Sequence, residues 1–246
     1  NETLKKNLSA TRKIKIDNTA PKVKSITSRS SAGYYKKDAS LLFMLEFSED
    51  VTITGVEGLN MQFTHKNSDV NVKTAGSTAT GSKYVLMTYN VAEGDNASPL
   101  EFGQLNASGV RVTDAAGNVL SGETLAVTTT PSFSGFEIDT TKPSAPSFGT
   151  WNPGKLVIAD DGTSFTLYEA EPGATVEYSL DGGQNWLPYT DTEEVSITNN
   201  GSYQVTARQT DKAGNVSQEA DVKTFIVNKG ALFKRITASS RSGTYT

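Results

Sequence analysis

Leu41-Leu42-Phe43-Met44-Leu45-Glu46-Phe47 is the stretch that decides the fold. Its apolar side chains recur at every second position, which places them on one face of an extended strand. The same period of two recurs within 85–91, 176–180 and 203–207. Short clusters of Gly, Asn, Asp and Ser separate these runs, and Leu180-Asp181-Gly182-Gly183 is typical of a hairpin turn in which glycine adopts a positive φ. The chain is therefore predicted to be all-β, built from antiparallel sandwiches.

Two motifs of the form Ile-Asp-(Asn/Thr)-Thr-x-Pro divide the chain, one at 16–21 and one at 138–143. Proline lacks a backbone donor and restricts the residue before it, so both motifs are predicted to be extended joints between domains. Residues 17–138 then form a first immunoglobulin-like domain and residues 139–228 a second. Residues 1–16 are expected to end a preceding repeat, and residues 229–246 to begin a third.

The predicted third repeat resembles the first. Lys234-Arg235-Ile236-Thr237 echoes Lys24-Ser25-Ile26-Thr27, and Gly243 and Tyr245 follow as Gly33 and Tyr35 do. Repetition of this kind indicates an array in which each unit mainly contacts its neighbours. We therefore expect tandem sandwiches arranged end to end, in a fragment of a longer protein.

Composition excludes several classes of function. The net charge is −4 and the isoelectric point about 5.2, so the chain lacks the basic patch of a nucleic-acid-binding protein. The longest apolar run, 41–45, is too short to span a membrane. Without cysteine there is no disulfide or thiolate metal site. The single histidine, His65, lies in a polar stretch without a triad pattern, so an enzyme is not expected.

A second repeated motif places carboxylates at one pole of each predicted sandwich. It is Thr113-Asp114-Ala115-Ala116-Gly117-Asn118 in the first domain and Thr210-Asp211-Lys212-Ala213-Gly214-Asn215 in the second. We predict a turn between the last two strands, with Asp accepting main-chain hydrogen bonds and Gly in the left-handed region. In an immunoglobulin-like sandwich this turn faces the end where the chain enters, so Asp114 is expected near Asp17.

The strand 41–47 is predicted to run into a loop, Ser48-Glu49-Asp50, at the same pole. Asp17, Glu49, Asp50 and Asp114 would then converge, and such carboxylates repel one another unless a cation lies between them. Oxygen ligands from loops suit Ca²⁺, which binds six to eight oxygens at about 2.3–2.6 Å, whereas Mg²⁺ requires stricter octahedral geometry. The sequence therefore predicts a calcium site.

The second domain offers a parallel set. Its strand 165–168 runs into Glu169-Ala170-Glu171, which would bring Glu169 and Glu171 to Asp139 and Asp211. Asp95, in the turn 92–96, is expected to approach this joint from the first domain. For Glu49, Glu169 and Glu171 the alternative is an ordinary solvated loop charge. The third joint, 227–232, has neither Asp nor Pro, so either Asn228 replaces the aspartate as a neutral ligand or the site is absent. We predict that this joint binds calcium more weakly and is more flexible.

These motifs resemble a known family. Residues 171–186, which include Asp181-Gly182-Gly183-Gln184-Asn185-Trp186, together with 208–217, are similar to the bacterial Ig-like repeats of giant adhesins. Residues 47–52 and 89–96 resemble a companion repeat type. The resemblance implies calcium-stiffened, extracellular extender domains on Gram-negative cell surfaces, secreted by a type I (RTX-like) route. It also implies that the linker and turn aspartates at 17, 114, 139 and 211 are calcium ligands.

Three classes of function compete. The first is a structural extender of a cell-surface adhesin, rigidified by Ca²⁺. Such a segment is expected to be monomeric and to contact the neighbouring repeats of its own chain. It would project a distal domain that binds host or surface glycan or protein during adhesion and biofilm formation. The alternative is a module that itself binds glycan or protein through exposed aromatic residues. Its candidates are Trp151, Trp186, Tyr189, Tyr34 and Tyr35. An enzyme is the least favoured class, since no nucleophile–base pattern is present.

Overall fold

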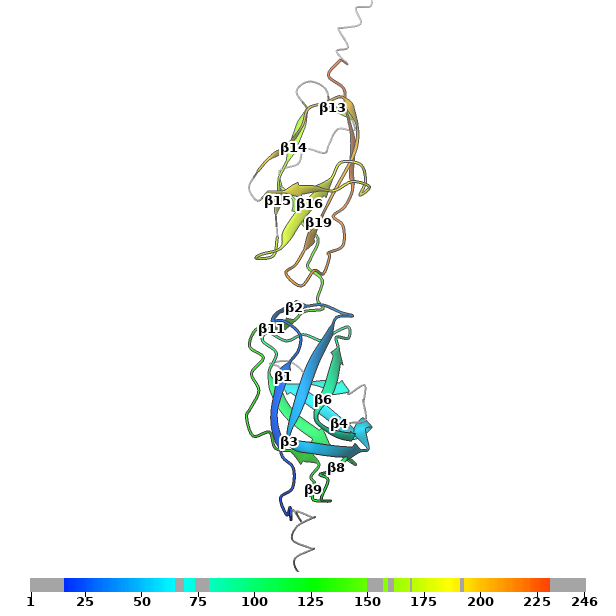
Figure 1. Cartoon of the computed structure of the whole chain (residues 1–246). Coiled ribbons are helices and arrows are strands. Elements are labelled where there is room, and N and C mark those ends of the chain that lie inside the picture. The colour runs from blue at the N-terminus through cyan, green and yellow to red at the C-terminus, as the bar shows by residue number, and fades with distance from the viewer. Residues whose placement is uncertain are drawn as a thin grey trace, which may run out of the picture. The chain divides into compact units, whose positions relative to one another are not determined.

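The computed structural model describes residues 16–64, 69–73, 80–149, 157–158, 162–168, 170–190 and 193–230. Within them every regular element is a β-strand except one 3-10 turn, η1 (Val56–Gly58), which confirms the predicted all-β fold (Figure 1). The chain divides into two compact units, Asn1–Thr141 and Lys142–Thr246, called unit 1 and unit 2 below. The division falls inside the second joint motif. Of the predicted flanking repeats at 1–16 and 229–246, residues 1–15 and 231–246 lie outside the described residues.

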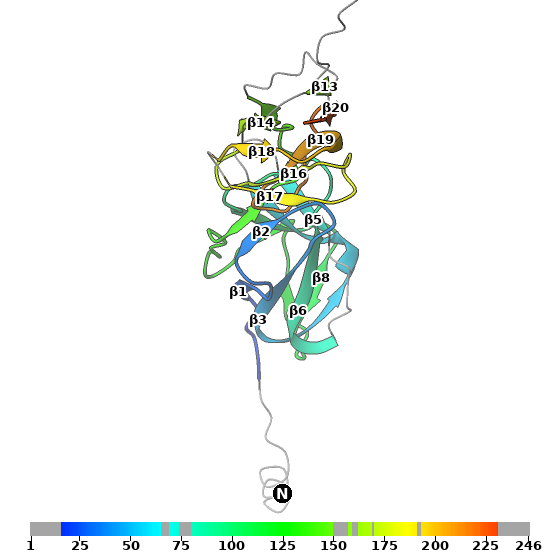
Figure 2. The ribbon, with the colours of Figure 1, turned by 90° about the horizontal axis from the view of Figure 1, so that it is seen from above.

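The first sheet of unit 1 is centred on β3 (Ser40–Thr54). Along one edge, β3 pairs antiparallel with β6 (Thr80–Asn90). Along the other edge it pairs first with β1 (Val23–Ser28) and then with β8 (Arg111–Thr113), which in turn pairs with β9 (Val119–Leu120). Figure 2 shows β1, β3, β6 and β8 of this unit together. β1 and β8 thus lie end to end beside one long strand.

The second sheet of unit 1 has the order β10 (Thr124–Leu125), β7 (Phe102–Ala107), β4 (Leu59–Thr64), β5 (Asp69–Lys73), with antiparallel pairing throughout. A separate parallel pair joins β2 (Gly33–Tyr35) to β11 (Phe136–Ile138). A second parallel contact joins the start of β1 to the chain that follows β10: Val23 bridges Val127, and its carbonyl accepts bonds from Thr128 N at 3.0 Å and Thr128 Oγ1 at 2.8 Å.

The core of unit 1 lies between its two sheets. The alternating residues predicted from the sequence, Leu41, Phe43, Leu45 and Phe47, are all fully buried. Phe43 meets Phe63 of the opposite sheet with ring centroids 5.4 Å apart, and Phe133 completes the cluster at 5.0 Å from Phe43. Aromatic pairs at these separations add to the stabilisation that burial provides. The period of two therefore identified the buried face correctly.

Unit 2 is built from one larger sheet and two strand pairs. The larger sheet has the order β13 (Val157–Ile158), β20 (Lys223–Val227), β19 (Gly201–Thr210), β16 (Thr175–Ser179), β17 (Leu187–Tyr189). The pairs are β12 (Ser147–Phe148) with β15 (Leu167–Tyr168), and β14 (Thr163–Phe165) with β18 (Val195–Ile197). The core gathers around Phe165, Val205 and Phe225. Val176, Tyr178 and Leu180 pack against it half-buried.

Two predicted elements were wrong. Residues 48–50 are not a loop but belong to β3, because β3 continues past the end of β1 and pairs again with β8, with its register shifted between Glu46 and Val51. The predicted strand 165–168 is two strands. β14 pairs with β18 and β15 pairs with β12, and the change of partner at Thr166 breaks the strand.

Candidate functional site

The candidate metal centre of unit 1 lies where β1 begins and β8 ends. The first pair of the β1–β3 ladder is Val23 with Phe47, and the last pair of the β8–β3 ladder is Thr113 with Thr52. Asp17 precedes β1, Asp114 follows β8, and Glu49 lies on β3 between the two ladders. Strand pairing alone therefore brings three carboxylates from distant parts of the sequence to one end of the sandwich.

The turn after β8 holds Asp114 in a fixed position. Its Oδ1 accepts bonds from the main-chain N–H groups of Ala116 (2.9 Å) and Asn118 (2.8 Å), and its Oδ2 accepts a bond from Asn118 Nδ2 (2.7 Å). Gly117 supplies the left-handed φ of 91° that this turn needs. The Asn118 side chain and then the main-chain donors hold the pKa of Asp114 below its usual value, against the opposing effect of burial. Asp114 is therefore a buried, ionised carboxylate at neutral pH.

Asn118 also fixes the N-terminal joint. Its Nδ2 donates to the main-chain carbonyl of Asp17 at 3.0 Å, while Asp17 Oδ1 accepts a bond from Thr19 N at 3.1 Å. Nearby, Lys22 and Ser48 exchange two hydrogen bonds, from Ser48 N to the Lys22 carbonyl and from Lys22 N to Ser48 Oγ. The joint motif is thus attached to the rest of unit 1 on both sides of Pro21.

The three carboxylates are close enough to share one cation. One oxygen each of Asp17, Glu49 and Asp114 lies within 4.8 Å of the others. Two oxygens on opposite sides of a calcium ion are separated by at most about 5 Å, twice the ligand distance. Among the described residues the Glu49 side chain makes no hydrogen bond or ion pair, so its charge is not balanced by a protein cation. The donor set therefore fits a hard divalent cation.

The other two predicted ligands of unit 1 lie elsewhere. Asp50 is exposed and outside the group of three. The hydrogen bond with Tyr84 raises the pKa of Lys83, and the charges of Glu46 and Asp50 add to the shift, which places Asp50 on the side of Lys83. Asp95 accepts bonds from Tyr89 Oη (2.8 Å) and Ala92 N (2.9 Å) through its Oδ2, which ties it to its own turn.

The predicted ligands of the second set are divided between the two units. In unit 2, Asp211 repeats the Asp114 turn: Asn215 N and Nδ2 both donate to its carboxylate at 2.8 Å, and Gly214 has a φ of 88°. Glu171 donates its main-chain N–H to Gln209 Oε1 at 2.9 Å. Asp139 belongs to unit 1, and Glu169 lies outside the described residues. A cation shared by this set stays a prediction.

All three joints form the same local turn. Asp17, Asp139 and Asn228 each use Oδ1 to accept the main-chain N–H two residues further on, at 3.1, 2.9 and 3.2 Å. This is the hydrogen bond of an Asx-turn, which Asn forms as well as Asp. Asn228 therefore occupies the position of the joint aspartate, although its side chain is neutral.

The structure adds interacting residues that the sequence reasoning missed. Asp181, in the β16–β17 hairpin, accepts bonds from Asn185 Nδ2 (2.6 Å), Asn185 N (2.9 Å) and Ser179 Oγ (2.7 Å), and these lower its pKa to about 2. Its spacing to Asn185 is that of Asp114 to Asn118. The Asp-x-x-x-Asn pattern was the available signal. The predicted positive φ values of this hairpin are confirmed at Gly182 and Gly183.

Asn96 holds the second joint to unit 1. Its Oδ1 accepts bonds from Thr140 N at 2.8 Å and from Thr141 Oγ1 at 3.3 Å. Thr140, which is buried, in turn accepts a bond from Gly94 N at 3.0 Å through its Oγ1. Direct hydrogen bonds therefore fix the second joint to unit 1 as far as Thr141.

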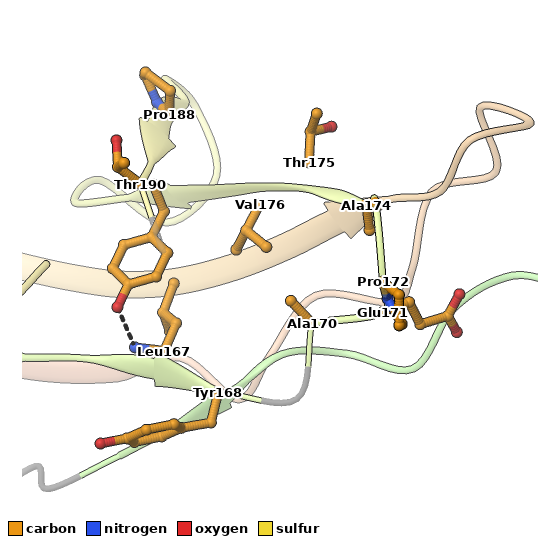
Figure 3. A pocket seen from close by; sticks show the side chains of 12 residues that line it. Leu167, Tyr168, Ala170, Glu171, Pro172, Ala174, Thr175, Val176, Pro188 and Thr190 are labelled. Atoms are coloured by element: carbon orange, nitrogen blue, oxygen red, sulfur yellow. Dashed lines mark hydrogen bonds between the residues drawn. The ribbon is translucent and has the colours of Figure 1, made fainter. Parts of the chain in front are cut away.

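Unit 2 contains an open pocket of about 600 Å³ between β15 and the β16–β17 hairpin (Figure 3). Leu167, Val176, Pro188 and Tyr189 supply much of its apolar lining. Tyr189 also lines the pocket, and its hydroxyl accepts a bond from Leu167 N at 3.0 Å, drawn as the dashed line in Figure 3. In the same view the Glu171 carboxylate points away from Val176. The pocket is therefore mainly apolar.

The aromatic residues predicted as ligand-binding candidates differ in exposure. Tyr34 is 46% exposed, whereas Tyr35 packs against the core and stacks on Phe136. Trp186 is half-buried, with the Arg208 guanidinium 4.0 Å above its ring. Trp151 lies outside the described residues. Of the candidates that the structure describes, Tyr34 is therefore the one that is exposed, and the others are partly buried.

No protein-family model and no curated protein matches the chain. Among solved structures, the fibronectin(III)-like modules of Clostridium thermocellum CbhA are 11% identical, with a TM-score of 0.36, covering 87% of this chain and all of that one. The ICAM-5 D1–D4 ectodomain fragment is 13% identical (TM-score 0.32), and a membrane-anchored protein of Corynebacterium diphtheriae 9% (TM-score 0.25), covering 83% and 85% of this chain.

The chain spans 54% and 57% of the length of the latter two structures. At these sequence identities and TM-scores, the fold is inferred from the strand pairing of this chain and the function from its own residues. In the part of the chain that the structure describes, no helix has the length and apolarity to cross a membrane.

Proposed function

We propose that this chain is an extracellular structural segment of a bacterial surface protein, stiffened by calcium at its joints. The observation that carries the proposal is the approach of Asp17, Glu49 and Asp114 to within 4.8 Å at the first joint. Asp17 belongs to the joint and the other two residues to the body of unit 1. A cation bound by all three links the joint to the unit and reduces the freedom of the chain between domains.

The expected strength follows from mass action. Calcium sites in extracellular modules have dissociation constants of about 0.1–1 mM. A cation that binds only the folded state at about tenfold above its dissociation constant stabilises that state by about 1.4 kcal/mol. In cytoplasm with little calcium the joint stays loose and the chain is ready for export, whereas calcium outside the cell sets the joint.

The resemblance of residues 47–52 and 171–186 to adhesin repeats supports a more specific proposal. The segment is an extender of a Gram-negative adhesin, exported by a type I route, which holds a distal binding domain away from the cell during adhesion and biofilm formation. Its partners are then the neighbouring repeats of its own chain, and the segment itself is monomeric.

Two adjacent carboxylates allow a sharp test of the calcium proposal. Glu49→Gln removes one of the three grouped charges, and Asp50→Asn removes the neighbouring charge outside the group. Melting of the full chain is measured with calcium, with magnesium and with chelator. Calcium is expected to raise the melting temperature of unit 1 by several degrees in the natural chain and in Asp50→Asn, but not in Glu49→Gln. A calcium shift of equal size in Glu49→Gln, or none in the natural chain, would rule the site out.

The pocket of unit 2 supports a second candidate function, direct binding of a glycan or a protein side chain. Its volume of about 600 Å³ is in the range of small-ligand sites. Tyr168, 54% exposed at its edge, offers a ring face for a sugar. NMR titration of the full chain with a glycan panel is the test. Saturable shifts at 167–168 and 187–189 that Tyr168→Ala abolishes would favour it.

A further inference from the structure

Asn200 occupies an exposed turn between β18 and β19. It is the only asparagine in the chain that is followed by glycine. Its Oδ1 accepts a hydrogen bond from Lys229 N at 2.8 Å. Its Nδ2 has no acceptor among the residues that the structure describes. The turn thus combines an accessible side-chain amide, whose Nδ2 has no acceptor among the described residues, with a neighbour that lacks a Cβ.

We propose that Asn200 is a site of spontaneous deamidation that releases Lys229, at the third joint. The main-chain nitrogen of Gly201 loses its proton and attacks Cγ of Asn200, a C–N bond forms, and the Cγ–Nδ2 bond breaks as Nδ2 takes up a proton and leaves as ammonia. Water then opens the resulting succinimide at either carbonyl, giving aspartate or isoaspartate. The reaction requires only water. Asparagine is a thermolabile residue, and glycine after it leaves the attacking nitrogen unobstructed.

Other asparagines of the described chain are better protected. Asn118 and Asn215 use Nδ2 to bond Asp114 and Asp211, and each is followed by valine, whose branched Cβ hinders attack. Asn185 uses Nδ2 to bond Asp181 and is followed by Trp186. Local hydrogen bonding and the following residue together distinguish Asn200 from these three.

Asp181 provides a contrast within the same unit, because it is also followed by glycine. Its carboxylate accepts hydrogen bonds from Asn185 and Ser179, and its pKa is lowered to about 2. An ionised carboxylate is a poor electrophile, so the equivalent ring closure at Asp181 is slow at neutral pH. The turns at Asn200-Gly201 and Asp181-Gly182 are therefore expected to form isoaspartate at different rates.

The consequence falls on the third joint. Lys229 follows Asn228, whose Asx-turn begins that joint, and the Asn200 side chain supplies the acceptor for its N–H. Isoaspartate inserts a carbon into the main chain and displaces that acceptor, whereas aspartate keeps an oxygen in place. The isoaspartyl product therefore frees Lys229 from the β18–β19 turn, and deamidation loosens the joint with age.

The test is to incubate the full chain at neutral and at mildly alkaline pH and to map isoaspartate by enzymatic methylation and peptide mass spectrometry. Gly201→Ala is the matched control, because Gly201 has no positive φ and the three atoms nearest an added Cβ all belong to the Tyr203 side chain, at 3.3 Å. Isoaspartate is expected at residue 200, several-fold faster than at residue 181, and much less in Gly201→Ala. Equal rates at residues 200 and 181, or no effect of Gly201→Ala, would overturn the site.

Hydrogen exchange at Lys229 tests the consequence separately. Aged chain rich in isoaspartate is expected to exchange the Lys229 amide faster than fresh chain, whereas Asn200→Asp is expected to retain protection. Unchanged exchange in aged chain would show that modification does not release the joint.

Discussion

The side-chain amide of Asn118 donates a hydrogen bond to the main-chain carbonyl of Asp17, 3.0 Å away and 101 residues earlier in the chain. The same nitrogen donates to Asp114 Oδ2 at 2.7 Å. One amide therefore sets the position of the joint and of a candidate calcium ligand together.

Asn118→Ala is expected to destabilise unit 1 by about 1–3 kcal/mol, because it leaves the acceptors at Asp114 and Asp17 unpaired in a partly buried setting. It is also expected to weaken calcium binding, since Asp17 and Asp114 are then free to move apart. Calorimetry of melting and of calcium binding measures both effects. Asn215→Ala, in the matching turn of unit 2, is the control: a loss of calcium binding at the first joint in that variant would contradict this role for Asn118.

Asp181 is expected to make unit 2 sensitive to acid. Its pKa is about 2 in the folded chain against an ordinary value of 3.8, so its contribution to stability is complete above about pH 4 and is lost as pH falls towards 2. Asp181→Asn removes the charge and is expected to flatten the stability of unit 2 across this range. Denaturant melts between pH 2 and pH 5 give the comparison. A profile that is as steep in the variant would assign the acid sensitivity to other groups.

Asn96→Ala is expected to release the second joint from unit 1. The substitution removes the acceptor for Thr140 N and Thr141 Oγ1, so the amide of Thr140 is expected to exchange faster while the core of unit 1 keeps its protection. Asn96→Asp keeps an oxygen acceptor and serves as the control. The effect is expected in chelator as well as in calcium, because these bonds need no ion. Protection at Thr140 that survives Asn96→Ala would argue against it.

Gly58→Ala is expected to destabilise unit 1 by about 1–3 kcal/mol, the usual cost of overpacking. A Cβ at this position would lie 2.0 Å from the main-chain carbonyl oxygen of Ser108, so the backbone itself has to shift. Thermal melting measures the loss. Gly94→Ala meets nothing within 4 Å and differs only through its positive φ of 88°, so it is expected to cost less.

The fold was predictable because its signal is local. The alternation of Leu41, Phe43 and Leu45 follows from the geometry of a strand with one buried face, and all three are buried. The turns at Asp114 and Asp211 were predictable for the same reason, since Asp, Gly and Asn at fixed spacing satisfy one another's hydrogen bonds. The Asp114 turn was predicted between the last two strands of unit 1, and this was wrong. The turn joins β8 to β9, and β10 and β11 still follow.

The candidate site was predictable only in part. Glu49 and Asp50 were assigned to a loop, which would allow both to reach one ion. In β3, however, Glu49 shares the side of Phe47 and Val51 while Asp50 is exposed, so the period of two separates them. The hydrogen bonds from Asn118 to Asp17 and from Thr140 and Thr141 to Asn96 were not predicted. Their partners are distant in sequence, and no local pattern marks such pairs.

The parallel contact between Val23 and the chain at 127–129 has a mechanical consequence. The N-terminal joint leads directly into β1, and 127–129 leads towards the C-terminal end of unit 1. Tension between the two ends pulls these neighbouring segments in opposite directions along their length. The bonds from Thr128 to Val23 and from Thr129 to Lys24 are therefore loaded at the same time, in shear, and do not open one after another. Unit 1 is therefore expected to resist such tension through these bonds acting together.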